Sequence, residues 1–167
     1  FYNENLRTAK AKYTFYSKGE KAHIRPYFTY YGFRYVKVVG EITEEELKSF
    51  RAYALYSDMD ETCEVQTSNE LVNRFISNVK WGQKGNFLDV PTDCPQRDER
   101  LGWTGDTQIF AATASYNMDT CAFYTKHMKD LRLEQEKLDG GIPFVVPYLK
   151  TVSATSGLRR HSSCDGQ

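Results

Sequence analysis

Residues 93–106 read DCPQRDERLGWTGD, and the rest of the chain is organised around this stretch. It holds four carboxylates, two arginines, one tryptophan, two glycines and one proline. Pro95 excludes a continuous helix and favours an extended conformation at Cys94, so we predict a charged loop. Loops of this kind between rigid elements often carry function. Ion-paired structural loops have a similar composition, so composition alone leaves both interpretations open.

Composition and charge exclude several classes of function. The chain has 167 residues, of which 26% are charged and 40% hydrophobic, values typical of a soluble globular protein. Because 22 basic side chains balance 22 acidic ones, we expect no nucleic-acid partner and no membrane-surface partner. No apolar run is long enough to span a bilayer.

The cysteines and histidines form no metal-ligand or nucleophile pattern. The four cysteines are Cys63, Cys94, Cys121 and Cys164. No two of them have zinc-ligand spacing, so we expect no metal and no cofactor, while a disulfide stays open. The histidines, His23, His127 and His161, are interpreted as surface or core residues. The chain starts at Phe1 without a signal-peptide pattern, so we interpret it as an internal piece of a longer protein. The cellular compartment of that protein stays open.

The first third of the chain has the composition of β-structure. Aromatic and β-branched residues predict strands over residues 13–16, 27–31, 33–39 and 52–56, with residues 41–48 as an acidic turn or short helix. We expect this part to be the end of a β-sandwich, because its strands need partners that the chain does not supply.

From Thr67 the apolar period changes from two to 3.6, which predicts three helices. The first follows a capping box at residues 67–70 and runs to about Trp81. The second starts near residues 105–106, with Asp106 as its cap. The third runs from residues 117–119 to about Leu138. The expected inward residues are Leu71, Val72, Phe75, Ile76 and Val79 in the first helix, Ile109, Phe110 and Ala114 in the second, and Phe123, Tyr124, Met128 and Leu131 in the third.

The charged loop has the side chains that a sugar-cleaving site requires. Such a site needs a proton donor for the leaving oxygen and a second carboxylate for the water or the anomeric carbon. An aromatic face for the sugar ring is common, and Trp103 supplies one. Crowded carboxylates raise each other's pKa, which keeps one of them protonated near neutral pH. The carboxylates are Asp93, Asp98, Glu99 and Asp106, and Arg97 and Arg100 are able to bridge them.

Residues 92–106 resemble the signature of bacterial α-L-rhamnosidases, glycoside hydrolase family 78. The resemblance covers roughly residues 23–154. Its other segments are Phe28-Thr29-Tyr30, residues 32–36, Ser57-Asp58-Met59, residues 86–91, residues 116–119 and Ile142-Pro143. A contiguous match of this length argues against a merely solvated loop.

The resemblance implies an inverting hydrolase that removes terminal α-L-rhamnose from a glycoside or polysaccharide. The implied fold is α+β: residues 1–62 end a β-sandwich domain, and residues 63–167 begin an (α/α)6 toroid glycosidase domain. By motif position Glu99 matches the general acid. Asp93 and Asp106 match carboxylates that bind rhamnose hydroxyls, Trp103 lines the sugar pocket, and Arg97 contributes to it. Asp98 could simply pair with a neighbouring arginine, and Cys94 is interpreted as packing.

Two departures from the family pattern accompany the resemblance. The family's general base is a downstream Glu that this chain does not reach, so we expect the chain to hold only the acid half of the site and to be inactive alone. Residues 157–167 do not fit the family pattern, in which a Gly-Asp-Ala helix start follows. We therefore hypothesise a frameshift near residues 155–158, which resequencing the DNA beyond codon 150 would test; an ordinary polar terminus is the alternative.

Two other functions stay open on the sequence. One is a carbohydrate-binding or interaction module that kept this fold segment and lost catalysis. The other is a toroid glycosidase that acts on a different sugar. Comparing aryl glycosides on the full-length protein distinguishes the latter from a rhamnosidase.

Overall fold

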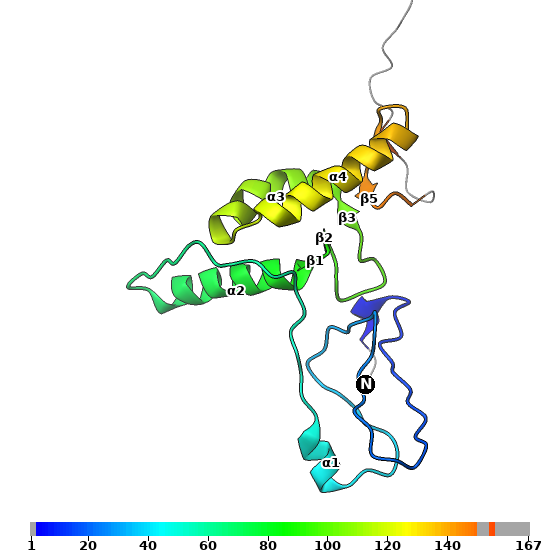
Figure 1. Cartoon of the computed structure of the whole chain (residues 1–167). Coiled ribbons are helices and arrows are strands. Elements are labelled where there is room, and N and C mark those ends of the chain that lie inside the picture. Colours follow the sequence, from blue (N-terminus) through cyan, green and yellow to red (C-terminus); the bar gives the residue numbers. More distant parts are fainter. Residues whose placement is uncertain (1–2, 150–153, 156–167) are drawn as a thin grey trace, which may run out of the picture.

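The chain forms two parts that meet at the charged loop, as the computed structural model shows (Figure 1). The structure describes residues 3–149 and the backbone of residues 154–155. Residues 3–50 lie on one side, and the helices α2, α3 and α4 lie on the other. The loop between β2 and β3 reaches from the helices towards the N-terminal part. The proposed frameshift at residues 157–167 lies outside the described residues.

The N-terminal part contains little regular structure. Its elements are the 3-10 helix η1 (Glu4–Leu6) and the helix α1 (Glu44–Ser49). A capping box between Thr43 and Glu46 begins α1, which confirms the short helix expected here. The strands predicted over residues 13–16, 27–31, 33–39 and 52–56 are wrong for this structure, because those residues form no strand pairing, and Phe28 has a φ of 56°. A strand needs neighbours to satisfy its backbone, and the described chain offers these segments none.

The helix α2 (Glu70–Asn86) is longer than its sequence pattern predicts. The side chain of Asn69 caps it by accepting from the backbone N–H groups of Leu71 and Val72, so the predicted capping box at residues 67–70 is wrong. The helix passes Gly82 and Gly85 and ends at Asn86. The predicted apolar face exists, but it is largely uncovered: Phe75 is 66% exposed.

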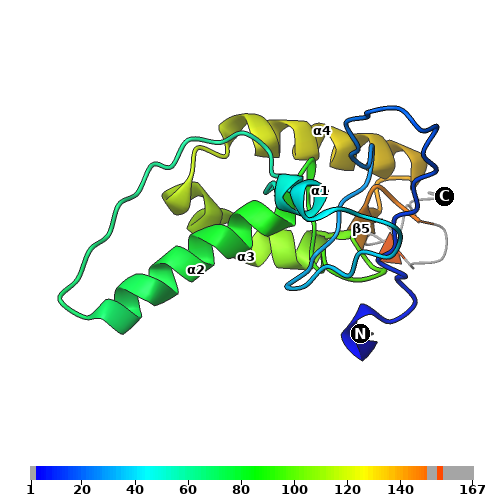
Figure 2. The same cartoon turned by 90° about the horizontal axis from the view of Figure 1, so that it is seen from below.

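A short hairpin leads from α2 into the loop. Strands β1 (Phe87–Leu88) and β2 (Val90–Pro91) pair antiparallel around Asp89, which turns the chain with a φ of 68°. The following helices are α3 (Thr104–Asn117) and α4 (Cys121–Lys137), close to the predicted spans. Asp106 does not cap α3, because the helix has already begun at Thr104. Figure 2 shows α2, α3 and α4 from below.

Four further short strands brace the start of α3 and the segment after α4. Strand β3 (Gly102–Trp103) pairs antiparallel with β5 (Val145–Val146). Strand β4 (Ile142–Pro143) pairs in the same sense with β6 (Ala154–Thr155). The backbone N–H of Thr104 also donates to the carbonyl of Phe144 at 2.9 Å. The β3–β5 pairing therefore holds Trp103 at the entrance to α3.

The core is a small aromatic cluster where the hairpin meets α3 and α4. Phe87 is 3% exposed and stacks on Phe123, with ring centroids 4.6 Å apart. Its ring edges contact Phe110 and Tyr124 at 6.2 and 5.9 Å. Ala114 completes the buried cluster. The inward positions predicted for Phe123 and Ala114 are confirmed, whereas those for Ile109 and Met128 are wrong, since both side chains are exposed.

Polar contacts join α2 to α3 beside this core. Gln83 is buried and donates to the carbonyl of Ala114 at 3.1 Å, while its oxygen accepts from Asn117 at 3.0 Å. Glu61, from the segment before α2, bonds to Lys80 and Lys84 at 2.9 and 2.7 Å. These contacts attach the connecting segment to the helical part. Within the described part of the chain, none of the helices has the length and apolar character needed to cross a bilayer.

Candidate active site

The loop between β2 and β3 is closed at its base by backbone hydrogen bonds. The N–H of Asp93 donates to the carbonyl of Leu101 at 2.9 Å, and the N–H of Arg100 donates to Cys94 at 3.3 Å. Gly102 lies so close to β5 that an added Cβ would be 2.6 Å from the Val146 carbonyl oxygen. A glycine is therefore required there, and it places the end of the loop tightly against the helical part.

Glu99 is the most heavily bonded side chain of the loop. Its Oε2 accepts from Nη2 and Nε of Arg97 at 2.6 and 3.1 Å. Its Oε1 accepts from the indole Nε1 of Trp103 at 2.6 Å. The carboxyl is mostly buried, with 13% of the side chain exposed. The three residues that the sequence assigned to the acid, the arginine and the aromatic face are thus in direct contact.

The ionisation of Glu99 differs from the sequence expectation. Burial of its carboxyl favours the neutral acid and taken alone raises the pKa of Glu99. Hydrogen bonds from Arg97 and Trp103, and one shared with Asp93, favour the carboxylate and outweigh burial. The net pKa of Glu99 is therefore lowered, so the expectation that crowding keeps this carboxyl protonated is wrong for the chain as it stands.

Asp93 and Cys94 lie next to Glu99. Ligand atoms of these three residues lie within 4.8 Å of one another, which is close enough for a metal ion. Burial, followed by the hydrogen bond to Asp93, raises the pKa of the Cys94 thiol to about 11. The thiol therefore keeps its proton and donates to Asp93 at 3.1 Å. With a protonated thiol and with Arg97 already on Glu99, the group is poorly suited to a cation.

Asp106 is the one predicted site residue that the structure does not bring into this cluster. It lies exposed in the first turn of α3. Among the described residues its carboxylate has no hydrogen-bond or ion-pair partner. Asp106 comes three residues after Trp103 in the sequence. Helix α3 begins between these two residues and leads the chain away from Glu99.

The other two charged residues of the loop contact the N-terminal part. Asp98 accepts from the backbone N–H of Thr8 at 3.2 Å and from the Thr8 hydroxyl, and its arginine partner is Arg7, 3.9 Å away, rather than Arg97 or Arg100 of the loop. The Arg100 guanidinium lies 3.9 Å from the ring centroid of Tyr30. Sequence reasoning missed the contact residues Thr8 and Arg7. Tyr30 lies in one of the segments that carry the family resemblance, and only this resemblance indicated that Tyr30 has a role at the site.

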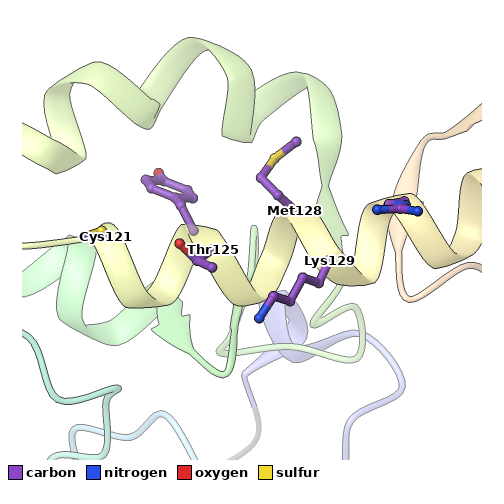
Figure 3. A pocket seen from close by; sticks show the side chains of 6 residues that line it. Cys121, Thr125, Met128 and Lys129 are labelled. Carbon is purple, nitrogen blue, oxygen red and sulfur yellow. The ribbon is translucent and has the colours of Figure 1, made fainter.

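A separate hollow of about 450 Å³ lies along α4 (Figure 3). It is an open groove on a single helix, far from Glu99 in sequence, and no carboxylate lines it. Its lining residues are Cys121, Tyr124, Thr125, Met128, Lys129 and Arg132. Because it lacks the carboxylates that a sugar-cleaving site requires, the hollow does not compete with the loop as a candidate glycosidase site.

Two family models cover nearly the whole chain. The bacterial alpha-L-rhamnosidase 6 hairpin glycosidase domain matches residues 60–159. The bacterial alpha-L-rhamnosidase concanavalin-like domain matches residues 1–56. The chain belongs to the bacterial alpha-L-rhamnosidase family. Residues 1–56 and the charged loop therefore match two different domain types of one family.

Curated relatives carry the name of the same family. An alpha-L-rhamnosidase of Streptomyces avermitilis is 44% identical over 148 residues, which are 87% of this chain and 14% of the relative. One of Formosa agariphila is 42% identical over 150 residues, or 88% of this chain and 16% of the relative. The chain thus spans about a seventh to a sixth of the length of these relatives.

Solved structures match the fold at similar identity. The alpha-L-rhamnosidase of Streptomyces avermitilis complexed with L-rhamnose has a TM-score of 0.57 and 45% identity over 59% of this chain and 10% of that one. The enzyme of Aspergillus terreus has a TM-score of 0.54 and 46% identity over 55% of this chain and 11% of that one. The rhamnosidase family assignment thus rests on both sequence and fold.

Proposed function

We propose that this chain carries the general-acid half of a site that hydrolyses terminal α-L-rhamnosides, with Glu99 as the acid. The observation that carries the proposal is the direct bonding of Glu99 to Arg97 and Trp103 in a family that includes an enzyme crystallised with L-rhamnose. The sugar would lie against Trp103, with Asp93, Arg97 and Asp106 binding its hydroxyls.

The reaction would be a single displacement with inversion. Glu99 would give its proton to the glycosidic oxygen as the bond from that oxygen to the anomeric carbon breaks. A water would attack the anomeric carbon from the opposite face and lose a proton to a second carboxylate, about 6.5–9.5 Å from the first. We assign that base to the part of the family fold that this chain does not match, an (α/α)6 toroid of which residues 63–167 form the beginning. Residues 1–62 belong to the preceding domain.

Arg97 is central to this mechanism because a general acid must be protonated before it acts. In the described chain Arg97 holds Glu99 ionised. If sugar hydroxyls accept the Arg97 donors, Glu99 loses its strongest cationic partner while staying buried. Its pKa then rises, which supplies the proton when substrate is present. Arg97 would therefore couple sugar binding to protonation of the acid.

The proposal is tested with a chimera in which residues 1–149 replace the matching segment of the Streptomyces avermitilis relative. Glu99→Gln should abolish hydrolysis of an aryl α-L-rhamnoside and preserve L-rhamnose binding measured by calorimetry. Asp93→Asn should weaken binding, and the exposed Glu64→Gln is the matched control for a lost carboxylate. Unchanged turnover in Glu99→Gln would overturn the assignment of the acid.

The chain by itself should not hydrolyse rhamnosides, because one carboxyl cannot serve both as acid and as base in an inverting reaction. The purified 167-residue chain is incubated with the same aryl rhamnoside. Turnover that disappears in Glu99→Gln would refute the half-site proposal. Preferred cleavage of another aryl glycoside by the chimera would instead favour a glycosidase of different sugar specificity.

A further inference from the structure

We propose that Thr8 and Tyr30, both from the segment that matches the concanavalin-like domain, are positioning residues for Glu99. The proposal rests on the proposed function, in which Glu99 is the acid. Neither residue touches the Glu99 carboxyl. Each instead binds one of its two neighbours in the chain, Asp98 and Arg100. Glu99 is therefore anchored from both sides by a segment some 70 to 90 residues earlier.

The first anchor is at Asp98. One carboxylate oxygen, Oδ2, accepts both the backbone N–H and the hydroxyl of Thr8. The adjacent Arg7 reaches the same place, with its Nη1 3.9 Å from Oδ1 of Asp98 and 3.6 Å from Oε2 of Glu99. Bonds to an ionised carboxylate are stronger than neutral ones, so this contact defines the direction of the Asp98 side chain.

The second anchor is at Arg100. Its guanidinium stacks on the Tyr30 ring at 3.9 Å and donates to the Tyr30 carbonyl at 2.5 Å and to the Pro95 carbonyl at 3.0 Å. The backbone of Arg100 has a φ of 54°, a left-handed conformation that costs free energy for a residue with a Cβ. That conformation persists only where the surroundings hold it, and Tyr30 supplies most of the contacts to this side chain.

The two anchors matter because they bind the residues on either side of Glu99, whereas the packing of Gly32 against Gln96 lies farther from it along the loop. A hollow of about 340 Å³ separates the two surfaces, lined on one side by residues 8–11 and on the other by Gln96, Arg97 and Asp98. The backbone bonds at the base of the loop hold Asp93 and Leu101, which flank the tip. Without Thr8 and Tyr30 the tip would be free to move, and Glu99 would lose its alignment with the glycosidic oxygen.

The test uses paired substitutions that remove or keep each contact. Thr8→Val removes the hydroxyl and Thr8→Ser keeps it. Tyr30→Leu removes the ring and Tyr30→Phe keeps it. In the chimera, Thr8→Val and Tyr30→Leu should lower kcat by about 10-fold to 100-fold with KM within about twofold, because misplacement of a reacting group affects the chemical step. The conservative variants should restore kcat.

Controls separate positioning from loss of fold. Thr14→Val and Tyr53→Leu change exposed residues of the segment that matches the concanavalin-like domain and should leave kcat unchanged. In the 167-residue chain, Thr8→Val should also shift the carboxyl carbon resonances of Asp98 and Glu99, and Thr8→Ser should not. This second readout decides the question if the chimera variants do not fold.

Two results would overturn the proposal. One is unchanged kcat in Thr8→Val and Tyr30→Leu together with full loss of activity in Glu99→Gln, which refutes positioning and leaves the acid assignment intact. The other is an equal loss of kcat in the conservative and the disruptive variants. Retained hydrolysis in Glu99→Gln would instead refute the proposed function itself.

Discussion

Replacing Phe87 by alanine should remove the centre of the only buried aromatic cluster in the described residues. The ring is 3% exposed and contacts three other rings, one stacked and two edge-on. Buried Phe→Ala changes cost about 3–5 kcal/mol in transfer and cavity terms. Each aromatic pair adds about 0.5–1.5 kcal/mol beyond its buried area, so we expect the upper part of that range.

The matched control is Phe75→Ala on α2. It deletes the same side chain where 66% of the residue is exposed, so the loss should be below about 0.5 kcal/mol. Phe87→Leu keeps part of the buried volume and should lie between the two. The expected order of stability losses depends only on how deeply each side chain is buried.

The assay is urea unfolding of the 167-residue chain followed by far-ultraviolet circular dichroism, because α2, α3 and α4 dominate that signal. The expected order of midpoints is Phe75→Ala above Phe87→Leu above Phe87→Ala. A cost of this size can exceed the stability of a small core, in which case Phe87→Ala shows no cooperative transition. Equal midpoints for Phe75→Ala and Phe87→Ala would refute the assignment of the core.

Three further predictions concern stability and its dependence on pH. Hydrogen bonds from its two lysine partners lower the pKa of Glu61 to about 2. Its stabilisation, about 1 kcal/mol after screening, is present above its unfolded pKa of 4.5 and is lost as pH falls towards 2. Glu61→Gln should flatten the fall in urea midpoint between pH 6 and pH 3, and an unchanged slope would contradict the pairing. Burial lowers the pKa of His127, so the fold favours its neutral form, and stability should fall as pH drops below the unfolded value of 6.5. His127→Leu should remove this fall in stability, and substitution of the exposed His23 by Gln should not. If stability still falls with pH in His127→Leu, the fall comes from another group. Gly102→Ala should lower the melting temperature by colliding with β5, whereas Gly82→Ala, which meets nothing within 4 Å, should raise it. A neutral Gly102→Ala would show that the β3–β5 contact is looser than the structure describes.

Helix positions were predictable because they depend on residues close in the chain. The apolar period of 3.6 and the polar residues before it located α2 and α4 within a few residues. The exact start of α2 was missed, since Thr67 and Asn69 are both good caps and the Thr67 hydroxyl instead bonds to Asn73. The end of α2 was missed because Gly82 and Gly85 are tolerated inside a helix when flanking residues continue it.

Strands were predictable only as a tendency. The aromatic and β-branched residues of 13–56 favour β-structure, but a strand forms only when another strand accepts its hydrogen bonds. None of the predicted strands finds such a partner among the described residues. Residue propensity therefore indicated that these segments favour β-structure, but it did not indicate whether they pair into a sheet.

Sequence alone determined the family of this protein and the residues of its candidate site, because the motif of residues 92–106 is contiguous. It also determined which segments are helical, since helix formation depends on local periodicity and capping. Tertiary structure alone decided that Arg97 and Trp103 share the Glu99 carboxyl and lower its pKa, and that Asp106 stands apart. It alone brought Thr8 to Asp98 across 90 residues. A pKa and a long-range hydrogen bond depend on burial and on distances in space, which one-dimensional spacing does not specify.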